Sequence, residues 1–216
     1  AMEWLDGQDL AQRLHRGPLP LLDALALLSR IAQGLSLAHQ RGILHRDLKP
    51  ANLFLPAGDL QRVKLLDFGI ARRQTATRAM TRTGTVIGTP EYMAPEQARA
   101  LDDVGPQADV FSLGCVLYQA LTGRSPFAAR HVSAILAKIL FEDPQPPSRL
   151  RAELPAAADA LLAAMLAKDP ARRPRDAGEV LALLDRSAAE SELTRPLTML
   201  GPWSGRELRL VSVIMA

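Results

Sequence analysis

Apolar residues recur at helical spacing through most of this chain. Between Leu19 and Gly42 they fall three and four positions apart and the pattern stops at a glycine, which predicts a helix of about twenty residues. The stretch from Pro106 to Gly123 is apolar almost all round, so it predicts a buried central helix that ends at Gly123. Shorter helices are predicted between proline-rich breaks, over 131–143, 155–170 and 176–187. The pattern therefore predicts a mainly α fold.

Two short apolar stretches interrupt the helical pattern. "GILHRD" (42–47) and "RVKLLDFG" (62–69) are flanked by turn residues, which predicts small strands around a loop. From Ile70 to Pro90 the periodicity disappears, Thr and Arg dominate, and no acidic residue occurs between Asp67 and Glu91. This segment is predicted to be a long basic loop, and loops of that length inside a compact domain are usually functional.

Composition narrows the class of protein. The chain has 216 residues, 48% of them apolar and 23% charged, which fits one soluble globular domain with a sizeable core. Its net charge is +3 without a dense basic run, which argues against a nucleic-acid partner. The uninterrupted apolar runs fall short of the ~18 residues of a membrane helix. A lone cysteine, Cys115, is predicted to lie in the core, and the expected location is cytoplasmic.

A set of short motifs suggests a family. In order, they are "HRDLKPAN" (45–52), "DFG" (67–69), "GTPEYMAPE" (88–96), "DVFSLG" (109–114) and "DPARRP" (169–174). In this order the chain resembles the C-terminal lobe of bacterial eukaryotic-like (Hanks-type) serine/threonine protein kinases, from about Met2 to Ser187. One triplet would be weak support, whereas the ordered set is specific. The resemblance implies a protein-kinase-like C-terminal lobe, a helical bundle with a few short strands around the catalytic loop.

The resemblance also implies a catalytic site that uses ATP and Mg²⁺. Asp47 matches the aspartate that orients the substrate hydroxyl and accepts its proton, and Lys49 places a positive charge near the transferring phosphate. Asn52 and Asp67 match the pair of oxygen ligands that holds Mg²⁺. Taken singly, each Asp or Asn is also typical of a turn, and only their combination favours the chemical interpretation.

Other matched residues are expected to be structural. By resemblance, His45 and Phe68 pack into the hydrophobic spine, and Asp109 accepts backbone hydrogen bonds from the catalytic loop. Glu96 and Arg173 match an ion pair that ties the segment after the long loop to the lower helices. His15, His39 and His131 are expected to be helix-surface or core histidines.

The motifs also indicate the acceptor. Lys49 stands where tyrosine-specific kinases generally differ, and Thr89 resembles the threonine that bonds Asp47 and Lys49. The expected partners are therefore proteins with Ser or Thr acceptors. Small-molecule phosphotransferases share an H-x-D-x-x-x-x-N loop but lack "DFG" followed by "APE", which argues against that class.

Arg46 suggests regulation, because an arginine at this position in the family pairs with a phosphorylated residue of the activation loop. The spacing of Thr81 and Thr83 resembles the autophosphorylated pair of bacterial kinases, and a phosphate would add about −2 charge to this basic loop. The alternative is that these threonines only reflect the threonine-rich composition of the loop and have no regulatory role.

The opening "AMEWLDGQDL" resembles the hinge between the two kinase lobes. By this resemblance Met2 is the gatekeeper, Glu3 to Leu5 bond adenine through their backbone, Asp9 contacts ribose, and Leu10 and Phe54 form the apolar floor under the base. Without a covering lobe, Met2, Leu5, Leu10 and Phe54 are expected to form an uncovered apolar face.

The N-terminal lobe of such a kinase is not found in the sequence. None of the 14 glycines is two residues from another, so no G-x-G-x-x-G is present, and the first lysine is Lys49. We expect 1–187 to be the hinge and C-terminal lobe of a longer kinase, inactive alone; the alternative is a non-catalytic, pseudokinase-like scaffold. Residues 188–216 are expected to be a linker or the start of a truncated following domain. Their end, "RELRLVSVIMA", fits the first strand of a nucleotide-cyclase-like module or a disordered tail.

Overall fold

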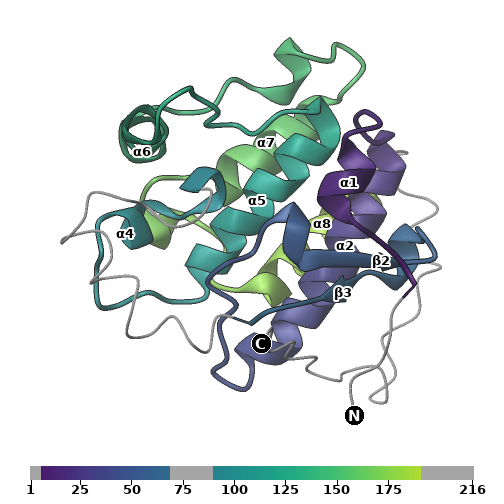
Figure 1. The fold of residues 1–216 in the computed structure, drawn as a ribbon, viewed down its shortest axis with the longest axis horizontal. Helices are drawn as coiled ribbons and strands as arrows, with labels where there is room; N and C mark the ends of the chain where they lie inside the picture. Colours follow the sequence, from purple (N-terminus) through teal and green to yellow (C-terminus); the bar gives the residue numbers. More distant parts are fainter. Residues whose placement is uncertain (1–5, 69–89, 191–216) are drawn as a thin grey trace.

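The computed structural model describes residues 6–68 and 90–190, without the side chains of 187–190. Helices dominate these residues, and the predicted mainly α fold is confirmed (Figure 1). The α-helices are α1 Leu10–Leu14, α2 Leu21–His39, α4 Pro95–Ala98, α5 Gln107–Thr122, α6 Val132–Phe141, α7 Ala156–Met165 and α8 Ala177–Glu190. Short 3₁₀ turns connect them: η1 Pro50–Asn52, η2 Leu60–Arg62, η4 Pro90–Tyr92, η5 Pro147–Arg149 and η6 Pro170–Arg172.

The helix α5 runs through the middle of the bundle (Figure 1). All but three of its 16 residues are buried, as its continuous apolar sequence predicts, and Cys115 is fully buried. The helix ends at Gly123, which has φ 78° and donates its N–H to Gln119 O over 2.8 Å. A left-handed residue at this position favours glycine because glycine has no Cβ. The predicted central helix and its glycine cap are therefore confirmed.

The helix α2 is the long helix predicted between Leu19 and Gly42. Among the described residues it is the one helix that is long and apolar enough to cross a membrane by length and composition, but half of the tested stretch is buried inside the fold. Its buried side packs against α5 and α8. Burial in the protein core therefore accounts for its apolar composition.

Three short strands form an antiparallel sheet beside α1 and α2 (Figure 1). They are β1 Gly7–Asp9, β2 Leu53–Pro56 and β3 Lys64–Leu65, with β2 in the middle. Alternate side chains of β2 face opposite sides, so Leu53 and Leu55 are fully buried while Phe54 is only half-buried. Phe54 pairs with Asp9 on one side and Lys64 on the other, so these three residues share a face.

The strand predicted over "GILHRD" is absent, and this prediction was wrong. The backbone of 43–47 is irregular because Arg46 has φ 62°, which a strand cannot accommodate. The N–H groups of His45 and Arg46 are bonded to a side chain, Asp109, instead of a neighbouring strand. The second predicted strand, over 62–69, is present as the short β3.

The helix predicted over 176–187 is α8, which continues to Glu190. Two further predictions fall mostly outside the described residues: the basic loop predicted over 70–90, of which 70–89 is not described, and the linker predicted over 188–216, of which 191–216 is not described. The expected domain boundary at residue 187 therefore stays a prediction.

Candidate catalytic site

Asp109 fixes the backbone that leads into the predicted catalytic loop. It lies in the first turn of α5 and its side chain is buried. One carboxylate oxygen, Oδ2, accepts the N–H of His45 and the other, Oδ1, accepts the N–H of Arg46, both over 2.7 Å. Hydrogen bonds to a carboxylate are stronger than neutral ones, and a buried carboxylate requires such donors to offset its desolvation. The position of the loop is therefore set by α5.

His39 adds a contact that sequence reasoning missed. Its Nε2 lies 3.0 Å from Oδ2 of Asp109, and its Nδ1 accepts the backbone N–H of Ala177 over 3.3 Å. Because Nδ1 accepts a hydrogen bond, Nε2 carries the proton and donates it to Asp109. His39 therefore joins the end of α2 to the beginnings of α5 and α8. Nothing in the sequence pattern distinguishes it from an ordinary helix histidine.

The three predicted catalytic residues form one cluster. The ammonium of Lys49 donates to Oδ2 of Asp47 over 2.9 Å. The amide of Asn52 donates to the backbone oxygen of Asp47 over 2.8 Å and to its Oδ2 over 3.4 Å. About a quarter of the Asp47 and Lys49 side chains is exposed (26% and 24%), so solvent and substrate can reach the charged groups.

Asn52 and Asp67 offer oxygen atoms of the kind that Mg²⁺ prefers. Asn52 is buried and uses its Nδ2 for Asp47, while its Oδ1 accepts no hydrogen bond from the described residues. The Leu66 N–H donates to Asn52 O over 2.9 Å, so the residue before Asp67 is tied to the catalytic loop. Asp67 itself is exposed, with φ 53°. An amide oxygen and a carboxylate are hard donors, so this pair fits a magnesium site.

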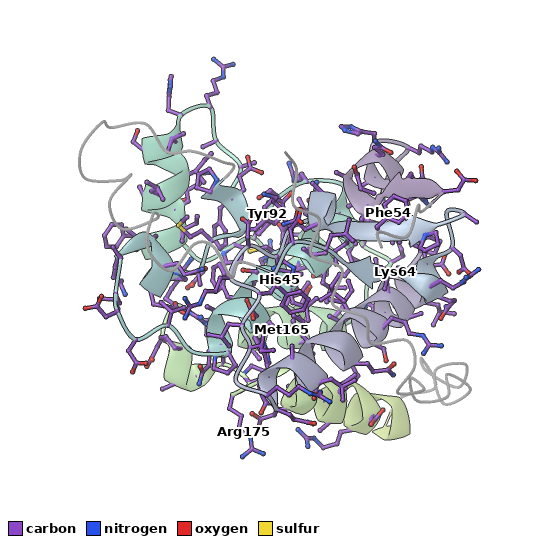
Figure 2. The ribbon with its side chains drawn as sticks, turned by 60° about the horizontal axis from the view of Figure 1, so that its bottom comes forward. His45, Phe54, Lys64, Tyr92, Met165 and Arg175 are labelled. Atoms are coloured by element: carbon purple, nitrogen blue, oxygen red, sulfur yellow. The ribbon has the colours of Figure 1, made fainter. Side chains whose placement is uncertain are left out.

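His45 and Phe68 pack against one another beneath the loop. Their ring centroids are 4.8 Å apart, and His45 is fully buried near the middle of the molecule (Figure 2). Burial lowers the pKa of the His45 imidazole, which keeps the ring neutral. Its Nε2 donates to Leu66 O over 3.0 Å. The histidine therefore connects the catalytic loop to the segment that carries Asp67.

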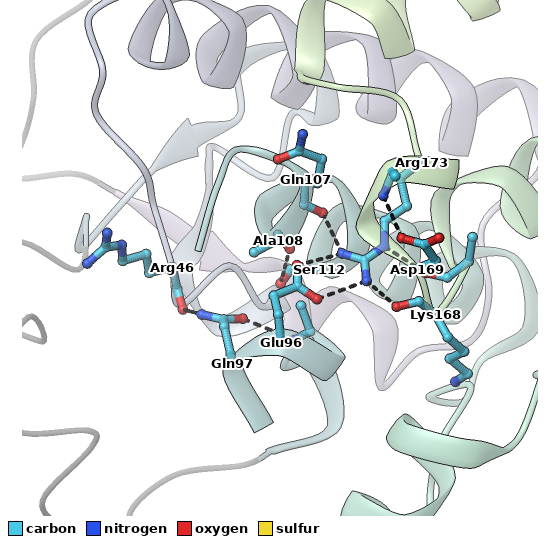
Figure 3. Close-up of polar contacts among 12 residues, drawn as sticks. Arg46, Glu96, Gln97, Gln107, Ala108, Ser112, Lys168, Asp169 and Arg173 are labelled. Atoms are coloured by element: carbon cyan, nitrogen blue, oxygen red, sulfur yellow. Dashed lines mark hydrogen bonds and ion pairs between the residues drawn. The ribbon is translucent and has the colours of Figure 1, made fainter. Parts of the chain in front are cut away.

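Glu96 and Arg173 form a buried, bidentate ion pair (Figure 3). Nη1 and Nη2 of Arg173 lie 2.7 and 2.9 Å from Oε1 and Oε2 of Glu96. The guanidinium also donates to the backbone oxygens of Ala167, Gln107 and Lys168. The pair thus joins α4 to the start of α5 and to the segment that precedes α8.

The predicted nucleotide face is described only in part. Phe54 and Asp9 share one face of the sheet, and Asp9 also caps α1 by accepting the Gln12 N–H over 2.7 Å. The expectation for Leu10 needs correction: its side chain is 0% exposed, so it lies in the core beneath the sheet and cannot touch a base. The cause is its place at the start of α1, which packs against β2 and η1. Figure 2 shows Phe54 and Lys64 near one another on the sheet.

The remaining predicted site residues cannot be placed. Met2, Glu3, Leu5, Thr81, Thr83 and Thr89 lie outside the described residues. Arg46 is described and half-buried, and its side chain points away from the Glu96–Arg173 pair (Figure 3).

Comparison with known proteins identifies the family. The family model described as the protein kinase domain matches residues 1–182. The chain belongs to the protein kinase domain family. Among curated kinases, the serine/threonine-protein kinase PknB of Mycobacterium leprae is 42% identical over 186 residues, which is 86% of this chain and 29% of that protein. The serine/threonine-protein kinase pkn3 of Myxococcus xanthus is 42% identical over 185 residues, 82% of this chain and 34% of that kinase. The chain thus spans about a third or less of the length of these kinases.

Proposed function

We propose that this chain supplies the catalytic-loop part of a serine/threonine protein kinase, which transfers the γ-phosphate of ATP to Ser or Thr hydroxyls of proteins. The observation that carries the proposal is the cluster of Asp47, Lys49 and Asn52, whose carboxylate, ammonium and amide lie within hydrogen-bond distance. The two residues that precede Asp47, His45 and Arg46, are held by backbone hydrogen bonds to the buried Asp109. The relatives named serine/threonine-protein kinases support the choice of acceptor.

The chemistry follows from the charges in this cluster. Asp47 orients the acceptor hydroxyl and takes its proton as the bond from the hydroxyl oxygen to the γ-phosphorus forms, while the bond from the γ-phosphorus to the bridging oxygen breaks and ADP leaves. Lys49, which lies 2.9 Å from the same carboxylate, stabilises the negative charge on the oxygens of the transferring group. Asn52 holds the backbone oxygen of Asp47 and thereby the loop conformation.

The nucleotide and its metal have candidate ligands in the described residues. Asn52 and Asp67 would hold Mg²⁺, and Phe54 and Asp9 would contact the base and ribose. When bound, Mg²⁺ neutralises charge on the phosphates of ATP. Asp67 follows Leu66, whose N–H and C=O are bonded to Asn52 and His45, so its backbone is fixed relative to Asp47.

Turnover requires more than these residues. A glycine-rich loop and a strand lysine normally cover the phosphates, and the 216 residues contain no G-x-G-x-x-G. We therefore expect the chain alone to be inactive and the missing groups to come from an N-terminal lobe of a longer polypeptide. The same lack favours the alternative, a non-catalytic scaffold. Retention of Asp47, Lys49, Asn52 and Asp67 favours the enzyme, because a scaffold has no chemical need of all four.

The finer parts of the proposal concern control and location. Phosphorylation of Thr81 or Thr83 would bring a phosphate to Arg46, and Thr89 would contact Asp47 and Lys49. A cytoplasmic location remains part of the proposal, because ATP is available there and the lone cysteine does not require an oxidising compartment.

A phosphate-transfer assay tests the function. Radiolabelled ATP, Mg²⁺ and a basic acceptor protein are incubated with this chain, and separately with a longer polypeptide that adds a glycine-rich loop and strand lysine. We expect no transfer by the chain and measurable transfer by the longer form. Asp47→Asn should lower kcat by about 10²–10⁴-fold, the usual contribution of a catalytic base.

A matched control is Asp59→Asn, which changes an exposed aspartate at the start of η2. It should leave transfer unchanged. A folded longer form that transfers no phosphate would favour the scaffold. Transfer by this chain alone, abolished by Asp47→Asn, would show that the glycine-rich loop is dispensable.

A further inference from the structure

We propose that Gln97 is a positioning residue of the catalytic loop, which holds the peptide bond between Arg46 and Asp47 in its strained conformation. Gln97 lies in α4, 51 residues from Arg46 in sequence, and none of the kinase motifs includes it. Its effect on turnover rests on the proposed function, whereas its effect on the loop backbone does not.

Both ends of the Gln97 amide are used (Figure 3). Oε1 accepts the backbone N–H of Ala94 over 3.0 Å, and Nε2 donates to the backbone oxygen of Arg46 over 2.9 Å. The Ala94 N–H can bond only the amide oxygen, and the Arg46 carbonyl can bond only the amide nitrogen. One orientation of the Gln97 side chain therefore satisfies both partners. The amide therefore bridges the start of α4 and the catalytic loop.

The carbonyl that Gln97 holds belongs to a strained residue. Arg46 has φ 62°, a left-handed conformation that crowds the Cβ of any residue other than glycine. Such a conformation persists only where the surroundings fix it. The N–H of Arg46 is bonded to Asp109 and its C=O to Gln97, so α5 and α4 hold the residue from its two sides. The held carbonyl is part of the peptide bond that leads directly into Asp47.

The helix that carries Gln97 is itself anchored. The preceding residue, Glu96, is 4% exposed and makes the bidentate pair with Arg173. Gln97 is partly buried as well. Because α4 is anchored in this way, Gln97 can fix the orientation of the peptide bond between Arg46 and Asp47.

One substitution separates the two bonds of Gln97. Gln97→Glu keeps an oxygen for the Ala94 N–H but replaces the donor to Arg46 by a second oxygen, which repels the carbonyl. Gln97→Ala removes both bonds and tests the side chain as a whole. Gln107→Glu is the matched control, because it adds the same charge at the start of α5, where the side chain bonds none of the described residues.

The first measurement is amide hydrogen exchange in the 216-residue chain, which needs no activity. In Gln97→Glu, we expect exchange in a peptide that covers residues 44–49 to become roughly fivefold to tenfold faster, the size expected for one lost hydrogen bond. Peptides from α5 and α7 should be unchanged, and Gln107→Glu should resemble the unmodified chain. Unchanged exchange at 44–49, or an equal rise over the whole chain, would overturn the proposal. If Gln97→Ala does not fold, Gln97→Glu still gives the result.

The second measurement is kinetic and uses the longer polypeptide. Gln97→Glu should lower kcat roughly fivefold to tenfold with KM for ATP unchanged, since it displaces Asp47 without touching the nucleotide residues. In an Arg46→Gly background the loss should be smaller, because glycine adopts φ 62° without strain. An equal loss in both backgrounds would contradict the role of strain.

The two measurements separate failure of this proposal from failure of the proposed function. Faster exchange at 44–49 in a longer form that transfers no phosphate would reject the kinase function and keep the positioning role. An active longer form in which neither exchange nor kcat responds to Gln97→Glu would reject the positioning role and keep the function.

Discussion

At the scale of single residues, the catalytic loop is held mainly by side chains from distant elements. Asp109 accepts hydrogen bonds from two successive backbone N–H groups, and Gln97 donates a hydrogen bond to the carbonyl that follows them. His39 in turn donates to the Asp109 carboxylate. None of these three touches the carboxylate of Asp47. Substitutions at these positions should therefore change the geometry of the site while leaving its reacting groups in place.

The motifs predicted the reacting groups but not all of their supports. Asp47, Lys49 and Asn52 lie within eight consecutive letters of a motif, so their proximity follows from the sequence. Gln97 and His39 are ordinary helix residues by pattern, and their bonds join positions 51 and 70 apart. Only the folded chain brings such donors and acceptors together, which is why sequence reasoning passed over them.

Arg173 provides a test of a buried charge. Arg173→Gln leaves the Glu96 carboxylate buried without its partner and removes donors to three backbone oxygens. Breaking such a pair typically lowers the free energy of unfolding by about 3–5 kcal/mol. Urea unfolding of the chain, followed by circular dichroism, should show this loss.

The control for that measurement is Arg175→Gln. The Arg175 side chain is 80% exposed, and its Nε lies 3.9 Å from Oε2 of Glu179. Exposed ion pairs of this kind contribute about 0–1 kcal/mol to the free energy of unfolding. If the two variants unfold at the same urea concentration, the Glu96–Arg173 pair does not carry the stability assigned to it.

At the scale of elements, the helices were predictable, whereas only β3 among the short strands was. In α2 and α8 the apolar residues recur at helical spacing over several turns, which defines these helices. The helix α5 is defined instead by its long, continuous apolar run, which ends at a glycine. "GILHRD" has the composition of a strand, but the left-handed Arg46 and the bonds to Asp109 give it an irregular backbone. The strand β1 is the reverse case, because its three residues, "GQD", carry no strand pattern.

Gly7 permits β1 to approach β2 closely. A Cβ at this position would lie 2.2 Å from Leu55 O, and the residue has φ 150°. Gly7→Ala should therefore separate β1 from β2 and lower the free energy of unfolding by about 1–3 kcal/mol through overpacking. Faster amide exchange in β2 would locate the effect.

Gly17→Ala is the matched control, because Gly17 also has a positive φ, 115°, but a Cβ there would meet nothing within 4 Å. It introduces backbone strain without the clash. If both variants lose the same stability and exchange in β2 is unchanged, the close approach of the two strands is not what requires glycine at position 7.

At the scale of the whole molecule, α5 connects the catalytic loop with α4 and with the segment that precedes α8. Asp109 near its start binds the loop, and the carbonyl of Gln107 accepts from Arg173, the partner of Glu96 in α4. The loop, α4 and the segment before α8 therefore meet at one end of a buried helix. A displacement of α4 would therefore also shift the peptide bond between Arg46 and Asp47, because Gln97 of α4 bonds its carbonyl.

The proposed phosphorylation switch uses the side chain of Arg46 rather than its backbone. Asp109 and Gln97 bond the backbone, and the guanidinium bonds none of the described residues, so we expect it to bind the phosphate. In the longer polypeptide, Thr81→Ala with Thr83→Ala should lower kcat/KM at least tenfold, and Arg46→Ala should lower it about equally, because each removes one side of a charge-assisted contact. Combining all three changes should add little, since the contact is already lost. The kcat/KM values of the four proteins give the coupling energy. Losses that multiply would show that the threonines and Arg46 act independently, and a phosphate-free wild type of full activity would exclude the switch altogether.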